Sequence, residues 1–150
     1  MKIAIDIKSG EVKNQEQKKE LIVGIDLGTT NSLIAFMDGE HPTTIKDRNS
    51  KNTIVPSVIF FDHDGLPHVG ESAKDNLISS PERTIYSIKR LMGKSYLDVQ
   101  SDDINTGYKI IENQDEETLV KVQVGDKFYS PIELSAIILR QLKQNAEKEL

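Results

Sequence analysis

Hydrophobic residues are concentrated in two neighbouring runs near the start of the chain, at residues 21–27 and 33–37. The first run is rich in β-branched side chains and is typical of a buried strand. Small polar residues occupy positions 29–32 between the runs, and the Asp-Gly pair at 38–39 is typical of a hairpin turn. The pattern predicts a strand, a polar turn, a second strand and a hairpin turn, with a third short strand near residues 43–45.

Further strand patterns occur along the rest of the chain, where apolar and β-branched residues form short runs or alternate with polar ones. We expect a break near Pro56 in one of them, because proline cannot donate a hydrogen bond within a sheet. The polar stretches 11–20 and 94–107 have no apolar periodicity, and they predict a linker and a surface loop. The predicted strands are residues 3–7, 53–61, 66–69, 108–111, 118–124 and 127–129.

The most strongly signalled helix is predicted at residues 131–150. Ser130 and Glu133 have the spacing of a capping box, and Pro131 stands at the first helical position. Apolar residues recur every four positions, which indicates one stripe packed against the core. The stripe consists of Leu134, Ile138, Leu142, Ala146 and Leu150.

Two shorter helices are predicted at residues 71–78 and 85–92. Thr84 is expected to be the N-cap of the second helix, and Gly93 is expected to end it. Lys89 lies at the edge of the apolar stripe of this helix. The pattern alone therefore favours a surface lysine whose aliphatic stem packs along apolar surface.

Composition restricts the class of protein. The chain has 150 residues, 37% hydrophobic and 29% charged, which is typical of a globular protein large enough to bury a core. Its net charge of −5 argues against a general nucleic-acid binder, and no apolar run reaches the roughly 20 residues that span a bilayer. The chain has no cysteine, which fits a cytoplasmic location and excludes disulfides. Its first residues lack the features of a signal peptide.

The polar turn between the first two strands is a candidate phosphate site. Gly28 permits a tight turn whose backbone N–H groups can surround an anion, and the side chains of Thr29, Thr30 and Asn31 add hydrogen-bonding groups. Asp26 stands at the end of the preceding strand, where a carboxylate can hold Mg²⁺ through water. Burying an unpaired carboxylate costs several kcal/mol of stability, so an aspartate within a buried strand is expected to have a partner or a function. The alternative is an ordinary hairpin in which Asp26 caps its own turn, and residue types leave both interpretations open.

Asp62, His63 and Asp64 raise a second question, because two carboxylates flank a histidine. Adjacent ligands in one turn make a poor metal site, and the same residues followed by Gly65 are typical of a hairpin turn. We therefore interpret this segment as a turn.

Four segments together carry a resemblance to a known family. Residues 24–32, GIDLGTTNS, resemble the first phosphate signature of the superfamily that contains actin, sugar kinases and heat-shock chaperones. The TTNS ending is similar to the DnaK-type chaperones in particular. TIVPSV at 53–58, Val-Gly at 69–70 and IKRLMG at 88–93 follow in the order expected for that family. The KRLMG spelling and the N-terminal extension are most similar to the iron–sulfur-cluster-assembly branch.

The resemblance implies an α/β fold, namely part of an actin-like, ribonuclease H-like ATPase lobe with a mixed sheet and helices. Residues 21–55 and 131–150 would belong to the base of the lobe, and residues 56–130 would form an inserted small α+β subdomain. Residues 1–20 would be an arm and linker. Because the helical pattern continues to Leu150, we expect the N-terminal portion of a longer domain, with weak nucleotide binding, negligible ATPase activity and a sheet edge exposed to self-association.

The resemblance also implies the roles of individual residues. Asp26 would hold the hydration shell of Mg²⁺, and residues 29–31 would contact the β- and γ-phosphates of ATP or ADP. Gly28 would form the turn itself. Lys89 would reach the γ-phosphate, where a fixed positive charge stabilises the transferring group. The resemblance thus reverses the interpretation of Lys89 that the helical pattern favours.

The whole protein would be a chaperone ATPase that assists protein folding or iron–sulfur cluster assembly. Its partners would be an unfolded or scaffold client protein, a J-domain co-chaperone and a nucleotide-exchange factor, with neither nucleic acid nor membrane among them. Three alternatives remain open from the sequence. They are a sugar or acid kinase of the same superfamily, an actin-like filament protein, and an interaction module without nucleotide chemistry.

Overall fold

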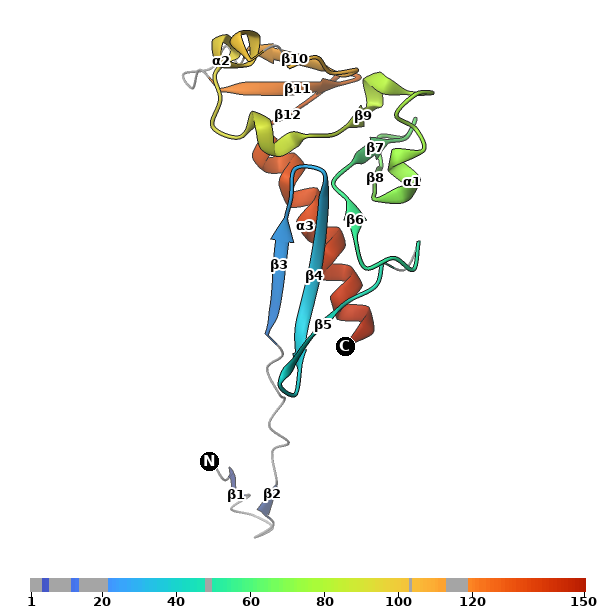
Figure 1. Ribbon diagram of the computed structural model, residues 1–150, viewed down its shortest axis with the longest axis vertical. Helices are drawn as coiled ribbons and strands as arrows, with labels where there is room; N and C mark the ends of the chain where they lie inside the picture. The colour runs from blue at the N-terminus through green and yellow to red at the C-terminus, as the bar shows by residue number, and fades with distance from the viewer. Residues whose placement is uncertain (1–3, 6–11, 14–21, 48–49, 103, 113–118) are drawn as a thin grey trace.

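The protein has an α/β fold built from antiparallel sheets and one long helix (Figure 1). The computed structural model describes residues 4–5, 12–13, 22–47, 50–102, 104–112 and 119–150. Every strand pair among these residues is antiparallel. The predicted α/β fold class is confirmed, and the antiparallel sheets with one long helix are consistent with part of an actin-like ATPase lobe.

The sheet that carries the polar turn contains β3 (Val23–Leu27), β4 (Asn31–Asp38), β5 (His41–Thr44) and β6 (Val55–Pro56). β4 lies in the centre and pairs with the other three strands. The order of strand, polar turn, strand and hairpin turn is as predicted. The third strand begins slightly earlier than expected.

The burial of β3 differs from the prediction. Val23 is 36% exposed, Ile25 is 41% exposed, and Asp26 is also exposed. Within the described part of the chain β3 pairs with β4 alone, so its other edge is open. Asp26 is therefore not buried, and the prediction that this strand is buried and encloses a costly carboxylate is wrong.

A second sheet contains β7 (Ile59–Phe61), β8 (Pro67–Val69) and β9 (Thr84–Ile85), with β7 in the centre. The break near Pro56 is confirmed, because β6 ends there and β7 starts three residues later. The predicted helix 71–78 is a single turn, α1 (Glu71–Lys74), followed by further turns.

The predicted helix 85–92 is wrong in its first half. Ile85 is the last residue of β9, and only Ile88–Leu91 form a short 3₁₀ helix, η2. Thr84 is completely buried, and its hydroxyl donates to the carbonyls of Asn76 and Ser80 instead of capping a helix. Another 3₁₀ turn, η1 (Pro81–Arg83), precedes β9.

A third sheet contains β10 (Lys109–Glu112), β11 (Val120–Val124) and β12 (Lys127–Tyr129) in chain order. The predicted surface loop at 94–107 contains a helix, α2 (Tyr96–Ser101). Ser95 and Asp98 form a capping box there, and hydrogen bonds from Ser95 hold the pKa of Asp98 below its usual value. This S-x-x-D spacing was a signal in the sequence that the prediction did not use.

α3 (Pro131–Glu149) joins the three sheets and runs behind the β3–β4 hairpin (Figure 1). The predicted capping box is present, and its stripe is buried at Leu134, Ile138, Leu142 and Ala146. Leu150 is 44% exposed, so the stripe is buried only up to Ala146. These residues belong to one continuous hydrophobic core that also includes buried residues of all three sheets.

A buried polar contact fixes the loop after β5 to the last turns of α3. Asp47 and Asn145 are 1% and 3% exposed, and the Asn145 amide donates to the Asp47 carboxylate at 3.1 Å. The backbone and hydroxyl of Ser50 donate to the second carboxylate oxygen, and Gln141 donates to Asn145. Both buried polar side chains therefore have partners, as burial requires.

Near the N-terminus, β1 (Ala4–Ile5) pairs with β2 (Val12–Lys13). The strand predicted at residues 3–7 is confirmed at its centre. β2 lies within the stretch predicted as a linker, whose other residues from 14 onward are outside the described part.

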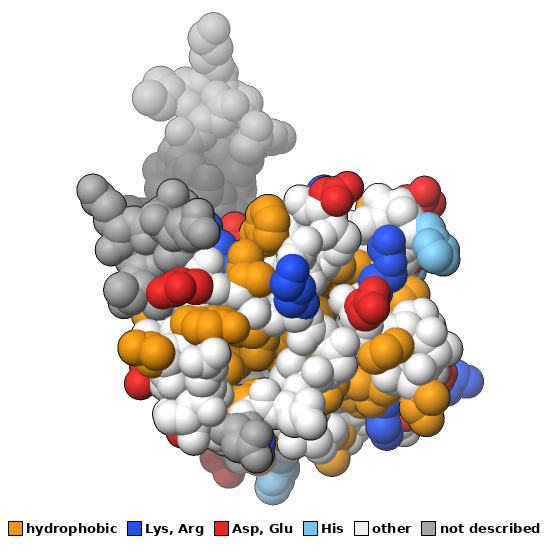
Figure 2. All heavy atoms as spheres, turned by 90° about the horizontal axis from the view of Figure 1, so that it is seen from above, with side chains coloured by type: hydrophobic (Ala, Val, Ile, Leu, Met, Phe, Trp, Pro, Cys, Tyr) orange, Lys and Arg blue, Asp and Glu red, His pale blue; other side chains and the backbone are white. Residues whose placement is uncertain are grey.

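At the opposite end of the molecule, basic and acidic side chains are interspersed among polar and hydrophobic ones (Figure 2).

Candidate phosphate-binding site

The turn between β3 and β4 has a shape that requires glycine. A Cβ atom placed on Gly28 would lie 2.0 Å from the carbonyl oxygen of Asn31, far inside van der Waals contact. Leu27 and Ser32 form the last strand pair before the turn. The backbone of the predicted phosphate residues is therefore held in one tight loop, and the side chains of Thr30 and Asn31 are exposed.

Ser57, which directly follows β6, fixes this turn. Its backbone N–H donates to the carbonyl of Thr30 at 2.8 Å, and its hydroxyl donates to the carbonyl of Gly28 at 2.9 Å. Since the Ser57 hydroxyl proton is used there, Ser32 donates to Ser57 across 2.8 Å between their hydroxyl oxygens. Both serines are almost completely buried. In the sequence Ser57 stands out only as part of the TIVPSV segment, and nothing there predicts its hydrogen bonds to the turn.

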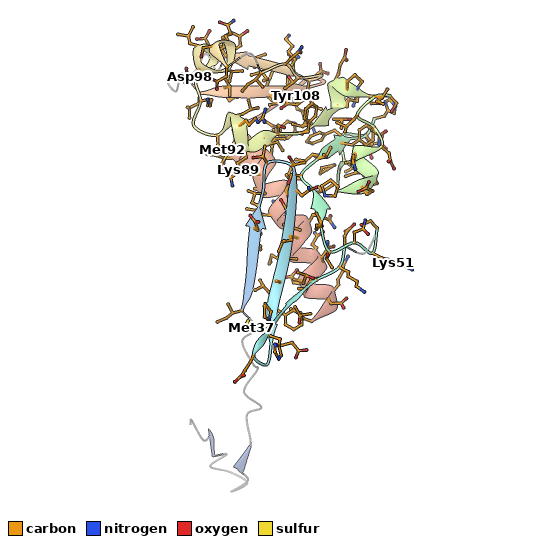
Figure 3. All side chains as sticks on the ribbon, in the orientation of Figure 1. Met37, Lys51, Lys89, Met92, Asp98 and Tyr108 are labelled. Atoms are coloured by element: carbon orange, nitrogen blue, oxygen red, sulfur yellow. The ribbon has the colours of Figure 1, made fainter. Side chains whose placement is uncertain are left out.

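Lys89 extends from η2 to the same turn. Its Nζ donates to the carbonyl oxygen of Leu27 at 2.9 Å, although the two residues are 62 positions apart in the sequence. Figure 3 shows Lys89 beside the end of the β3–β4 hairpin. Ile88 and Leu91 are buried and anchor η2 in the core, while the Lys89 side chain is exposed. A positive charge therefore stands next to the glycine turn.

Asp26 lies on β3 opposite Leu33, one residue before Leu27. Its carboxylate is exposed and forms no hydrogen bond to the turn within the described residues, which disfavours the alternative in which Asp26 caps its own turn. An exposed carboxylate fits Mg²⁺, because this ion retains much of its hydration shell and binds proteins through few direct ligands. Asp26 and Lys89 thus supply charges of opposite sign to one end of the hairpin.

A hollow of about 480 Å³ adjoins the turn. Residues 29–31 line it together with residues 56–58, Tyr86 and Ser87. Lys74 also contributes to the lining and forms an ion pair with Glu71 at 3.3 Å. The turn therefore faces a partly apolar recess on one side, large enough for a small molecule.

The segment around His63 is a turn, as interpreted from the sequence. The Asp62 carboxylate accepts hydrogen bonds from the backbone N–H groups of Asp64 and Leu66 and lies 2.8 Å from His68 Nε2. The contact with His68 and these backbone bonds hold the pKa of Asp62 below its usual value. The described residues contain no group of three or more acidic or histidine side chains placed to hold a metal ion.

The model of the family described as Hsp70 protein matches residues 22–150, which is most of the chain. The chain belongs to the Hsp70 family. Hsp70 proteins are chaperones that bind ATP or ADP with Mg²⁺ and act on client proteins together with co-chaperones. Membership in the Hsp70 family favours the chaperone over the kinase, filament and interaction-module alternatives.

The Hsp70 match includes every residue predicted for the site. The structure brings the turn at 28–31 together with Lys89, and β3 presents Asp26 beside them. The match also includes Ser57, whose burial and separation from the turn along the chain concealed its contact. In the described part of this Hsp70 chain, no helix combines the length and apolar character needed to cross a bilayer.

Proposed function

We propose that residues 22–150 supply one side of the Mg-ATP site of an Hsp70 chaperone. The observation that carries the proposal is the contact between the Lys89 ammonium group and the Leu27 carbonyl at the start of the glycine turn. Backbone N–H groups around a glycine and an adjacent cation are two independent features that favour phosphate. Here both occur at one end of one hairpin.

In this proposal each residue has a distinct task. The backbone and side chains of residues 29–31 bind the β- and γ-phosphates, and Gly28 permits the turn that aims them. Asp26 orients the water ligands of Mg²⁺, which neutralises phosphate charge when it is bound. Lys89 releases the Leu27 carbonyl and donates to the γ-phosphate oxygens, where negative charge is concentrated during phosphoryl transfer.

The site is proposed to be half of a composite site. Asp26, Thr30 and Lys89 are all exposed, and phosphoryl transfer needs groups that converge on the phosphates from several sides. Residues 21–55 and 131–150 would form the base of the lobe and residues 56–130 the inserted subdomain. Residues 1–150 alone would then hydrolyse ATP negligibly, and a facing lobe would complete the site.

The finer biological assignments follow the same proposal. ATP turnover by the complete domain would control binding of an unfolded or scaffold client, with a J-domain co-chaperone and a nucleotide-exchange factor as partners. The KRLMG segment and the N-terminal extension favour the iron–sulfur-cluster-assembly branch. A cytoplasmic location fits the absence of cysteine. The open edge of β3 would allow self-association.

Isothermal titration calorimetry with Mg-ATP tests the proposal. The two samples are residues 1–150 alone and the complete domain, in which residues 1–150 are continued through the facing lobe. We expect binding by the complete domain, much weaker or no binding by residues 1–150, and reduced affinity after Gly28→Ala in the complete domain. Equal binding by both samples would refute the half-site, and absence of binding in both would refute the nucleotide site.

A further inference from the structure

The chain changes direction sharply just before Lys89, at Ser87. This residue has φ 55° and ψ 28°, in the left-handed region that non-glycine residues rarely adopt. Such a conformation persists only where the surrounding structure holds it in place. The direction in which η2 leaves this elbow determines where Lys89 points. The contacts that hold the elbow are therefore part of the geometry of the site.

Both flanks of the elbow are fixed by burial. On the N-terminal side, Ile85 is completely buried and pairs with Ile59 of β7. On the C-terminal side, Ile88 and Leu91 are buried, and the N–H of Arg90 donates to the Ser87 carbonyl at 3.0 Å. Between these two anchors the backbone of residues 86 and 87 has to be held by other groups.

Tyr108 supplies the contact at the centre of the elbow. Its hydroxyl donates to the carbonyl oxygen of Tyr86 at 2.6 Å, and the two rings meet edge to face with centroids 5.5 Å apart. Tyr108 precedes β10 and is only 4% exposed. Burial raises the pKa of Tyr108 well above its usual value, so its hydroxyl remains protonated and remains a donor.

We propose that Tyr108 is a positioning residue, whose hydrogen bond to Tyr86 holds the Ser87 elbow and thereby directs Lys89 to the phosphate turn. This inference rests on the proposed function, because it assumes that Lys89 acts on the nucleotide. Tyr108 directly precedes β10 of the third sheet and Lys89 belongs to η2, and Figure 3 labels both positions. The third sheet thus has a defined mechanical connection to the site.

Tyr108 acts on the orientation of Lys89 and leaves the turn itself unchanged, because Gly28 and Thr30 are held by Ser57 instead. Loss of the hydroxyl should therefore slow hydrolysis more than it weakens ATP binding. In the complete domain, we expect Tyr108→Phe to lower kcat roughly fivefold and to change KM for ATP less than twofold. Tyr129→Phe is the matched control, because Tyr129 stacks on Phe61 away from the elbow, and it should leave both constants unchanged.

Steady-state ATP turnover is measured at a temperature where circular dichroism shows every variant fully folded. In a Lys89→Met background, which is itself slow, we expect Tyr108→Phe to have no further effect. Ser87→Gly relieves the strain of the left-handed conformation and should restore part of the kcat lost in Tyr108→Phe. If Tyr108→Phe does not fold, Ser87→Val replaces it, because a β-branched residue disfavours this conformation and should reproduce the selective loss of kcat.

Three results would overturn the inference in different ways. Normal turnover by Tyr108→Phe or its substitute Ser87→Val, together with slow turnover by Lys89→Met, would reject the positioning role and leave the proposed function intact. Normal turnover by Lys89→Met would reject the role of Lys89 and the inference with it. An equal loss in Tyr108→Phe with and without Lys89→Met would also reject positioning, because the tyrosine would then act independently of the lysine.

Discussion

Replacing Ser57 by alanine removes the hydroxyl group that connects β6 to the glycine turn. In the folded protein this hydroxyl donates to the Gly28 carbonyl at 2.9 Å and accepts from Ser32 at 2.8 Å. The backbone hydrogen bond from Ser57 to Thr30 does not depend on the side chain. The substitution therefore removes one buried and one partly buried hydrogen bond, while the backbone hydrogen bond keeps residue 57 next to the turn.

The expected loss of stability follows from these two bonds. Each contributes about 1 kcal/mol net, and the Ser32 hydroxyl would additionally remain buried without its acceptor, so we expect Ser57→Ala to cost about 2–3 kcal/mol. Ser32→Ala removes one bond but leaves Ser57 bound to Gly28, and it should cost about 1 kcal/mol. The double variant has no stranded Ser32 hydroxyl. Its loss should therefore be smaller than the sum of the two single losses.

Urea unfolding followed by far-ultraviolet circular dichroism measures these free energies of unfolding. Ser79→Ala is the matched control, because Ser79 is exposed, and it should change the free energy by less than about 0.5 kcal/mol. The reasoning is refuted if Ser57→Ala is as stable as Ser79→Ala. Strict additivity in the double variant would show instead that the two hydroxyl groups do not interact.

Gly28→Ala should destabilise the fold by about 3 kcal/mol, because its Cβ would lie 2.0 Å from the Asn31 carbonyl; urea unfolding with the parent's stability would contradict this. Backbone and hydroxyl hydrogen bonds from Ser130 lower the pKa of Glu133, so its contribution to stability is present above the unfolded-state pKa and is lost as pH falls through the lower folded-state pKa. Glu133→Gln should therefore reduce the loss of stability between pH 7 and pH 3. If thermal unfolding shows the same loss in the parent and the variant, Glu133 does not contribute in this way. If the protein self-associates through the open edge of β3, as proposed, Ile25→Lys should reduce that association in sedimentation velocity; equal sedimentation of the parent and the variant would refute the proposal.

Local signals in the sequence were sufficient for α3 and for the β3–β4 hairpin. The capping box of Ser130 and Glu133 and the repeat of apolar residues act within a few positions of one another, so they are visible before folding. The same holds for the turn at Gly28. These elements agree with their predictions because local preference and tertiary packing favour the same structure.

The segment around Thr84 shows where local preference fails. A threonine before an apolar stripe is usually a good N-cap. Thr84 instead pairs with Phe60 of β7, and its hydroxyl contacts the carbonyls of Asn76 and Ser80. Those partners lie 24, 8 and 4 positions away, and the pairing with β7 outweighs helix propensity. Burial of β3 was mispredicted for a related reason, since strand composition does not reveal how many neighbours a strand has.

The site itself depended on both kinds of information. Residue types left a phosphate turn and an ordinary hairpin both open. The pattern around Lys89 favoured an ordinary surface lysine, and only the resemblance assigned Lys89 to the γ-phosphate. In the structure Lys89 contacts the Leu27 carbonyl beside the turn, and its role toward the nucleotide stays a prediction. The contact of Ser57 with Gly28 joins residues 29 positions apart, and no spacing rule would have identified it.

The contact between Asp47 and α3 can form only late in synthesis, because its two partners are far apart in the sequence. Asn145 lies 98 residues after Asp47 in the sequence. At about 5–20 residues per second, the ribosome therefore adds Asn145 roughly 5–20 s after Asp47. During that interval the β3–β4 hairpin has emerged without the helix that covers it. Exposed hydrophobic strands in nascent chains are prone to aggregation. The segment of this chain that emerges first is therefore more exposed to aggregation until α3 has been synthesised.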